Sequence, residues 1–363
     1  MAEPKRVLIA DDSITCREYL RFLLEKEGGF QVVGVAADGE DAVRQALALK
    51  PDLIAMDIHM PKMNGIEASR KILETLRVPI VMVSDVWQTA EVQKAFEAME
   101  IGAVGGVQKP PGLGHPEAEM FARKLIRTMK LMADLPVIRR TARPEGKSPP
   151  SGGPAPNDCL RRRPLKVPIR LIAMGASTGG PPVLKEILHC LPAGFSVPVL
   201  VVQHISAGFL PGMVEWMQRE CAVRLRIPAS GEAVEPGTVY FAPDGVHMGI
   251  DPRGMIFFSN ERSEHGVKPS VSVLFRTVAA SYGAAAVGVL LTGMGKDGAQ
   301  ELLLLRQKGA LTVVQDQASC VVFGMPGEAV RLGAAECVLP PAEIARTLIE
   351  AVSGRSAGGL SAV

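Results

Sequence analysis

The 363-residue sequence has no segment that would insert it into a membrane or direct it for export. Apolar runs such as 197–202 and 284–291 are much shorter than the ~20 residues needed to span a bilayer. The residues after the N-terminal MAEPKR do not form the apolar core of a signal peptide. We therefore expect a soluble, cytoplasmic protein without direct membrane insertion.

The sequence also lacks clustered cysteines and an excess of one charge. Its six cysteines are scattered, with no close pair at metal-ligand spacing, so we expect free thiols in a reducing compartment. They are Cys16, Cys159, Cys190, Cys221, Cys320 and Cys337. A formal net charge of +2 gives no general attraction to nucleic acid. A hydrophobic content of 47% and a length beyond one ordinary core predict a globular chain with more than one domain.

Apolar strands and amphipathic helices alternate in residues 1–132, which we assign to the first domain. The expected strands are 7–10, 32–35, 53–56, 80–83 and 103–107. The expected helices are one after Ser13, 40–49, one from about Ile66, and 117–132. This alternation predicts an α/β fold in which a doubly wound parallel sheet gathers functional groups at the carboxyl ends of its strands.

Five polar residues follow these strands: Asp11, Asp12, Asp57, Ser84 and Lys109. Carboxylates that converge on one sheet edge repel one another unless a cation lies among them, and hard oxygen ligands suit Mg²⁺. The hydroxyl and the ammonium could bind an anion attached to one carboxylate. A single Asp here would be a solvated helix cap, but five such residues on one sheet favour a common site.

The segment resembles the receiver domain of bacterial two-component response regulators. The likeness rests on Asp11-Asp12, the run 57–65 (DIHMPKMNG), Ser84 and Lys109-Pro110. It implies a flavodoxin-like (βα)5 fold in which a histidine kinase phosphorylates Asp57. Asp11, Asp12 and Asp57 would then hold Mg²⁺, while Ser84 and Lys109 contact the phosphoryl oxygens. Gly106 stands where many members have an aromatic switch residue, a departure that affects the usual aromatic relay but not phosphorylation.

Residues 133–167 change to a composition rich in Pro, Gly, Arg and Lys. Such a segment buries too little apolar area to fold alone, so we expect a flexible linker. Its basic run at 161–163 is typical of a solvated linker, and we assign it no role with nucleic acid. Residues 168–354 form the second domain, and 355–363 a tail.

The second domain repeats the alternation of strands and helices. Expected strands are 171–174, 197–203, 286–291, 311–314 and 338–339, and expected helices include one from Pro181, 270–281 and 342–352. Short β-rich runs and turns between about 224 and 260 predict β-hairpins inserted at an edge of a mostly parallel, doubly wound sheet.

Three polar residues stand beyond three of these strands: Ser177, His204 and Asp297. A Ser hydroxyl becomes nucleophilic when a neutral imidazole takes its proton, and a carboxylate on the other ring nitrogen orients that imidazole. Taken singly, the turn around Ser177 could bind a phosphate or merely bend the chain, His204 could be a packed residue, and Asp297 a helix cap. Their occurrence together on this topology favours hydrolysis.

Two nucleotide-binding motifs fail on inspection. Gly295-Lys296 resembles the end of a P-loop, but Asp297 stands where Ser or Thr is required and Leu290 where the first Gly should be. At the turn 175–180, Ser177 occupies the second glycine of a dinucleotide fingerprint. We therefore expect no nucleotide in this domain.

Longer blocks in the second domain resemble the chemotaxis protein-glutamate methylesterase (CheB) family. They are 175–180 (GASTGG), 203–205 (QHI), 269–275 (PSVSVLF), 291–298 (LTGMGKDG) and 319–327 (SCVVFGMPG). The resemblance implies a cofactor-free esterase domain with Ser177, His204 and Asp297 as its catalytic residues. Backbone N–H groups near Thr178 and Met294 would form the oxyanion hole. Lys268 is a departure, since many relatives have Arg before the Pro-Ser pair.

The resemblance also implies substrates and partners. A protein of this kind releases methanol from glutamate methyl esters, and deamidates glutamines, on methyl-accepting chemoreceptors, which gives sensory adaptation in chemotaxis. A chemotaxis histidine kinase would be the phosphodonor, and we expect a monomer in which the unphosphorylated receiver covers the catalytic cleft. The alternatives are an esterase or amidase for another substrate, and an adaptor that binds receptors without turnover. DNA binding is disfavoured because no basic recognition helix follows the linker.

Overall fold

The computed structural model describes residues 3–26, 29–84, 96, 105–112, 114–133 and 167–353. The chain divides into two compact units, each of which is considered by itself. Of the predicted linker, residues 134–166 lie outside the described residues, and so does the predicted tail 355–363.

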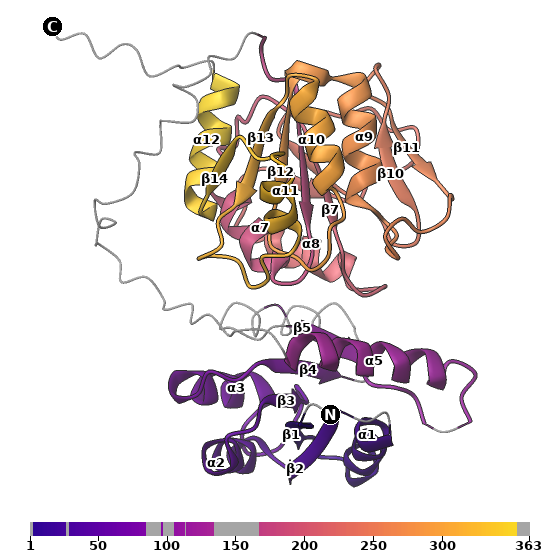
Figure 1. Cartoon of the computed structure of the whole chain (residues 1–363), viewed down its shortest axis with the longest axis vertical. Helices are drawn as coiled ribbons and strands as arrows, with labels where there is room; N and C mark the ends of the chain where they lie inside the picture. The colour runs from indigo at the N-terminus through magenta and orange to yellow at the C-terminus, as the bar shows by residue number, and fades with distance from the viewer. Residues whose placement is uncertain are drawn as a thin grey trace, which may run out of the picture. The chain divides into compact units, whose positions relative to one another are not determined.

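The first unit contains a five-stranded parallel sheet in the order β2-β1-β3-β4-β5, with helices packed against it (Figure 1). Its described elements are β1 (Lys5–Ala10), α1 (Ile14–Lys26), β2 (Phe30–Ala36), α2 (Gly39–Leu49), β3 (Leu53–Met56), α3 (Gly65–Thr75), β4 (Ile80–Ser84), β5 (Gly105–Gln108) and α5 (Ala118–Ala133). The predicted strands match these elements, although residues 103 and 104 of the fifth lie outside the described part.

Local sequence explains how the helices of this unit begin close to the sheet edge. Asp38 caps α2 by accepting the N–H of Asp41 at 2.8 Å, and Asn64 caps α3 by accepting two backbone N–H groups. At Gly65 a Cβ atom would lie 1.8 Å from the backbone oxygen of Asp57. Only glycine therefore allows α3 to begin this close to the end of β3.

The second unit contains a seven-stranded sheet in the order β14-β13-β12-β6-β7-β9-β8, in which all neighbouring strands are parallel (Figure 1). Its strands are β6 (Leu171–Ala176), β7 (Val199–Gln203), β8 (Arg224–Arg226), β9 (Thr238–Phe241), β10 (His247–Ile250), β11 (Ile256–Ser259), β12 (Ala286–Leu290), β13 (Leu311–Gln315) and β14 (Cys337–Leu339). Its helices are α7 (Gly180–His189), α8 (Leu210–Gln218), α9 (Val271–Ser281), α10 (Ala299–Gln307), α11 (Met325–Arg331) and α12 (Pro341–Ser353), with a 3₁₀ turn at Gly283–Ala285.

The region predicted as hairpins folds differently in part. β8 and β9 join the main sheet as parallel strands at its edge, and only β10 and β11 form an antiparallel hairpin. The turn at 235–237 precedes β9 without reversing the chain onto β8, because β8 and β9 run in the same direction. Turn residues indicate where a strand ends, whereas its direction depends on which strand it pairs with.

The structure also bears on two expectations from the sequence, free cysteines and the lack of membrane-spanning helices. Cys16, Cys190, Cys221 and Cys320 are free, as expected, whereas Cys337 is disulfide-bonded, so the prediction of a free thiol is wrong there. Spacing along the chain does not reveal which cysteines the fold brings together. Within the described residues, every helix is too short or too polar to cross a bilayer.

Candidate functional site

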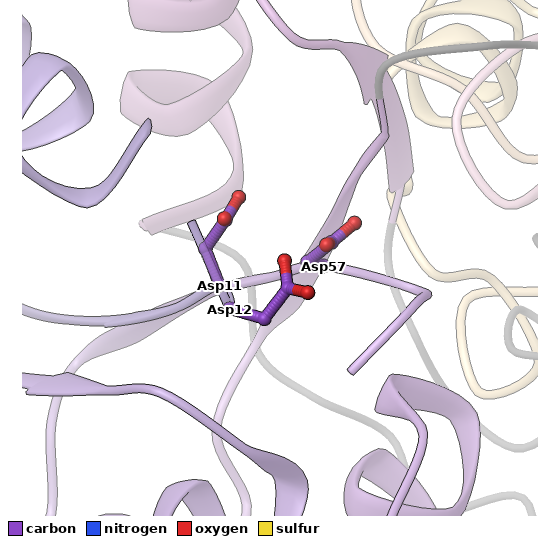
Figure 2. A group of neighbouring side chains, drawn as sticks. All are labelled: Asp11, Asp12 and Asp57. Carbon is purple, nitrogen blue, oxygen red and sulfur yellow. The ribbon is translucent and has the colours of Figure 1, made fainter. Parts of the chain in front are cut away.

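The three aspartates predicted for the first unit lie together at the carboxyl edge of its sheet (Figure 2). Asp11 follows β1 and Asp57 follows β3, and these neighbouring strands end in register, with Ala10 opposite Met56. One carboxylate oxygen from each of Asp11, Asp12 and Asp57 lies within 4.8 Å of the other two. Asp11 and Asp57 are buried, whereas Asp12 is exposed.

Lys109 and Ser84 reach the same edge from the other side of β3. The Lys109 Nζ atom lies 2.8 Å from Asp11 Oδ2 and 3.1 Å from Asp57 Oδ2. The backbone N–H of Lys109 donates to the carbonyl of Ser84 at 2.8 Å, which joins the ends of β4 and β5. The fold therefore brings all five predicted residues to one end of the sheet.

The electrostatics of this site suit a divalent cation. Burial raises the pKa of Asp57 to about 6, and the charge of Asp11 acts in the same direction against the lowering effect of Lys109. Burial alone would lower the pKa of Lys109, but its hydrogen bond to Asp11 and the two carboxylate charges raise it overall. One ammonium thus does not offset three carboxylates, and their hard oxygen atoms are the ligands that Mg²⁺ prefers. The residues present fit Mg²⁺.

Gly106 occupies the position at which many receiver domains have an aromatic side chain, as the resemblance implies. It lies in β5 and pairs with Met82 of β4. Gly106 therefore offers no side chain for an aromatic relay at this position.

In the second unit, Ser177 lies directly after β6, near the middle of the seven-stranded sheet. Its N–H donates to the carbonyl of Thr292 at 3.0 Å, and its own carbonyl accepts the N–H of Gly180 at 2.8 Å. Gly179 has a φ of 77°, and a Cβ atom there would lie 2.6 Å from Cβ of Val321. This glycine therefore permits the tight turn that places Ser177 before α7.

His204 and Asp297 meet at the same edge. His204 follows β7, whose last residue pairs with the last residue of β6, and Asp297 lies in the loop between β12 and α10. The His204 Nε2 atom lies 2.9 Å from Asp297 Oδ2. Burial alone would raise the pKa of Asp297, but hydrogen bonds from His204, Ser270 and Ser272, together with the charge of His204, hold it well below its usual range.

Backbone contacts place Ser177 close to His204 and to the loop that leads to Asp297. Gln203 Nε2 donates to the carbonyl of Ser177 at 2.9 Å and to that of His204 at 2.8 Å, so one amide holds both loops. At Gly293, in the loop that leads to Asp297, a Cβ atom would lie 2.6 Å from Cβ of Ser177. The hydroxyl of Ser177 itself forms no hydrogen bond with another described residue. In proteins without substrate, catalytic hydrogen bonds are often long and tighten only when substrate binds.

The backbone amides predicted to stabilise an oxyanion are available. Within the part of the chain that the structure describes, the N–H groups of Thr178 and Met294 have no acceptor. Thr178 directly follows Ser177, and Met294 directly follows Gly293, the glycine packed against the Ser177 side chain. Two free donors thus flank the hydroxyl.

Sequence reasoning missed the groups that support this arrangement. Gln315, at the end of β13, accepts the N–H of Thr292 at 2.8 Å, and the Thr292 hydroxyl donates to the carbonyl of Thr178 at 3.0 Å. Gln203 and Gln315 are the last residues of the strands on either side of the β6–β12 pair. In the sequence, each of these two residues could have been recognised as a polar residue at the end of an otherwise apolar strand.

Known proteins carry both parts of this chain. Residues 7–115 match the family model of the response regulator receiver domain, and residues 172–348 match that of CheB methylesterase. The chain is 46% identical over 359 residues to a protein-glutamate methylesterase/protein-glutamine glutaminase of Nitrosospira multiformis, a match that covers 98% of this chain and 99% of that protein. The chain belongs to the protein-glutamate methylesterase/protein-glutamine glutaminase family.

Further similarities cover nearly the whole chain in one case and about half of it in another. A protein of Syntrophus aciditrophicus named protein-glutamate methylesterase/protein-glutamine glutaminase 1 is 45% identical over 348 residues, covering 95% of this chain and 97% of that protein. The solved CheB methylesterase catalytic domain of Thermotoga maritima is 35% identical and covers 51% of this chain and 99% of that chain, with a TM-score of 0.49.

Membership of the methylesterase family confirms the predicted family and the predicted combination of a receiver domain with a methylesterase domain. The receiver match includes the five polar residues between Asp11 and Lys109, and the methylesterase match includes Ser177, His204 and Asp297. The domain boundaries at 132, 168 and 354 stay predictions.

Proposed function

We propose that this chain hydrolyses glutamate methyl esters and deamidates glutamine side chains on chemoreceptors, under the control of phosphorylation at Asp57. The observation that carries the proposal is the pairing of His204 with Asp297 at 2.9 Å, beside a serine whose flanking amides are free. This arrangement supplies a nucleophile, an oriented base and an oxyanion hole at one sheet edge.

The direction of proton transfer follows from the hydrogen bonds of His204. Asp297 Oδ2 accepts a hydrogen bond from His204 Nε2, so Nε2 carries the proton and Nδ1 is the basic atom. Ser177 Oγ attacks the ester carbonyl carbon while His204 Nδ1 takes the hydroxyl proton. The oxyanion that forms accepts hydrogen bonds from the N–H groups of Thr178 and Met294.

Collapse of the tetrahedral intermediate breaks the bond between the carbonyl carbon and the methoxy oxygen. His204 returns the proton to that oxygen, and methanol leaves an acyl group on Ser177. Water then attacks the acyl group with His204 again as base, which restores the serine and leaves a glutamate. With a glutamine substrate the leaving group is ammonia, and the same residues act.

The receiver supplies the control. Asp57 would accept a phosphoryl group from a chemotaxis histidine kinase, and Asp11, Asp12 and Asp57 would hold Mg²⁺, which offsets negative charge around the phosphoryl group. Lys109 and Ser84 would contact the phosphoryl oxygens. The raised pKa of Asp57 supports this assignment, because burial and the neighbouring charge of Asp11 both disfavour its charged form, and strongly shifted groups of this kind gather at functional sites.

The test measures methanol release from radiolabelled methylated chemoreceptor. Ser177→Ala is expected to lower the rate by several orders of magnitude. Acetyl phosphate with Mg²⁺ is expected to raise the rate of the wild-type chain but not of Asp57→Asn. Wild-type release by Ser177→Ala would refute the mechanism, and receptor binding without any methanol release would favour an adaptor.

A further inference from the structure

The carboxylate of Asp297 is held by the first turn of α9 as well as by His204. Asp297 Oδ1 accepts the Ser270 hydroxyl at 2.7 Å and the N–H of Ser272 at 3.0 Å, and Oδ2 accepts the N–H of Val271 at 2.7 Å. Ser270 is the N-cap of α9, is fully buried, and accepts the N–H of Ser272 at 3.1 Å with the same hydroxyl oxygen. Its hydroxyl therefore fixes the helix start and the carboxylate together.

A second histidine fixes Ser270 in turn. His247, in β10, is fully buried, and its Nδ1 accepts the N–H of Ser270 at 3.2 Å. Its Nε2 lies 3.1 Å from the carbonyl of Arg262, to which it donates. One imidazole thus ties together both ends of the connection from the β10–β11 hairpin to α9. With Nδ1 accepting and Nε2 donating, only the neutral ring satisfies both bonds.

We propose that His247 and Ser270 are positioning residues of the esterase site: they hold the Asp297 carboxylate in the orientation that keeps His204 Nε2 bonded and Nδ1 turned toward Ser177. This inference rests on the proposed catalytic roles of Ser177, His204 and Asp297. The physical reason is that a carboxylate can rotate about its Cβ–Cγ bond. Donors on Oδ1 that come from a rigid helix end prevent that rotation.

The first test changes the hydroxyl. Ser270→Ala removes the donor to Asp297 Oδ1, and we expect kcat for methanol release to fall about 10- to 100-fold with little change in KM, since an error of about 1 Å in a catalytic group has effects of this size. Ser270→Thr keeps a hydroxyl at the same position and is expected to restore kcat to within about threefold of wild type.

The second test separates the two nitrogens of His247. In His247→Asn the amide oxygen replaces Nδ1 as acceptor for Ser270, whereas in His247→Gln the amide nitrogen replaces Nε2 as donor to Arg262. Both variants remove a ring from the same cavity, so both lose packing. We expect His247→Asn to keep most of kcat and His247→Gln to lose about tenfold or more.

A matched control exists at the other end of the same elements. Ser281, at the end of α9, donates its hydroxyl to the carbonyl of Ile250 in β10 at 3.1 Å. Ser281→Ala therefore removes a hydrogen bond between α9 and β10 without touching Asp297. It is expected to leave kcat unchanged, while its thermal midpoint falls slightly.

All variants are measured in the full chain with saturating phosphodonor, so that regulation does not mask the chemical step. Wild-type kcat in Ser270→Ala or His247→Gln would overturn the proposal. Equal losses of kcat in His247→Asn and His247→Gln would overturn the role of His247 by showing a packing effect alone. Ser177→Ala is measured alongside: activity in that variant refutes the proposed function itself, whereas its inactivity beside a fully active Ser270→Ala refutes only the positioning role.

Discussion

Replacement of Asp297 by Asn tests both the chemistry and the packing of the esterase site. Each carboxylate oxygen of Asp297 accepts two hydrogen bonds: Oδ1 from Ser270 and Ser272, and Oδ2 from Val271 and His204. An asparagine has one acceptor atom and one NH₂ group. If the NH₂ group replaces Oδ2, it faces the N–H of Val271. If it replaces Oδ1, it faces the hydroxyl of Ser270, while the N–H of Ser272 still has the Ser270 oxygen as an acceptor. In either orientation one buried donor, the Val271 N–H or the Ser270 hydroxyl, loses its acceptor on residue 297.

The size of both effects follows from this geometry. A buried donor without a partner costs about 1–3 kcal/mol, so the unfolding free energy of the second unit is expected to fall by that amount in Asp297→Asn. The imidazole also loses the carboxylate that sets its tautomer, and the same change in a Ser-His-Asp triad lowers kcat by about 10⁴-fold. We therefore expect methanol release to fall by roughly three to four orders of magnitude.

Hydrogen exchange, followed by mass spectrometry on peptides from β6 and β12, measures the stability effect in the full chain. A loss of 1–3 kcal/mol corresponds to about 5- to 150-fold faster exchange of the most protected amides. Asp316→Asn is the matched control, because the two hydrogen bonds that its carboxylate accepts within the described residues, from the N–H and the hydroxyl of Ser319, both use Oδ1. An asparagine can keep Oδ1 as acceptor, so this variant should exchange and turn over like wild type.

Acid provides a further check on the same group. Because its hydrogen bonds lower the pKa of Asp297 in the folded chain, the stability that this carboxylate contributes is complete above its unfolded pKa of 3.8 and is lost as the pH falls below that value. The exchange difference between wild type and Asp297→Asn should therefore shrink below about pH 4. A variant that exchanges at the wild-type rate at pH 7, or one that still releases methanol at the wild-type rate, would refute the reasoning.

Two other predictions concern the receiver and the loop beside the nucleophile. Because burial raises the pKa of Asp57 to about 6, its charged form destabilises the folded receiver at neutral pH. At pH 7.5, Asp57→Asn should then raise the unfolding free energy of the receiver by up to about 3 kcal/mol, which slower hydrogen exchange in β1 and β3 would report. This gain should decline below pH 6, vanish near pH 4, and be smaller when Mg²⁺ is added to both proteins. Faster exchange in the variant would contradict this prediction. Gly293→Ala places a Cβ atom 2.6 Å from Cβ of Ser177 and 2.5 Å from Sδ of Met325. It should lower kcat about 100-fold, whereas Gly194→Ala, whose Cβ meets nothing within 4 Å, should not; an equal effect of the two would exclude crowding as the cause.

The positions of the candidate residues could be predicted because parallel strands place their carboxyl ends at one edge. Asp11, Asp57, Ser177 and His204 each follow an apolar strand that periodicity and length identify, and the fold places them where that pattern indicates. Asp297 required one more step, since it lies seven residues beyond the end of β12. The residues that support them could not be predicted in this way, because they lie far away in the sequence, as Ser270 does from Asp297.

The edge of the second sheet and the disulfide of Cys337 could not be predicted either, because both depend on which distant segments the fold brings together. β8 has three residues, too few for a hydrophobic period to show which face or direction it takes. Its parallel pairing with β9, and that of β9 with β7, depends on tertiary neighbours and not on the turns between them. His247 was missed for the same reason, because its partners Arg262 and Ser270 are brought to it by the hairpin.

Asp57 and Asp297, one buried aspartate from each site, illustrate how one structural rule serves two kinds of chemistry. Asp297 accepts four hydrogen bonds, which hold its pKa well below the usual range and leave its oxygens fully engaged, as suits a group that orients an imidazole. Among the described residues, Asp57 accepts one backbone N–H, from Ile58, and faces one ammonium. Burial outweighs these two lowering contacts, so its pKa rises. A carboxylate that is to accept a phosphoryl group needs accessible oxygens, and a carboxylate that holds a catalytic base does not. The number of donors around each group, more than its burial, therefore distinguishes the reactive aspartate from the supporting one.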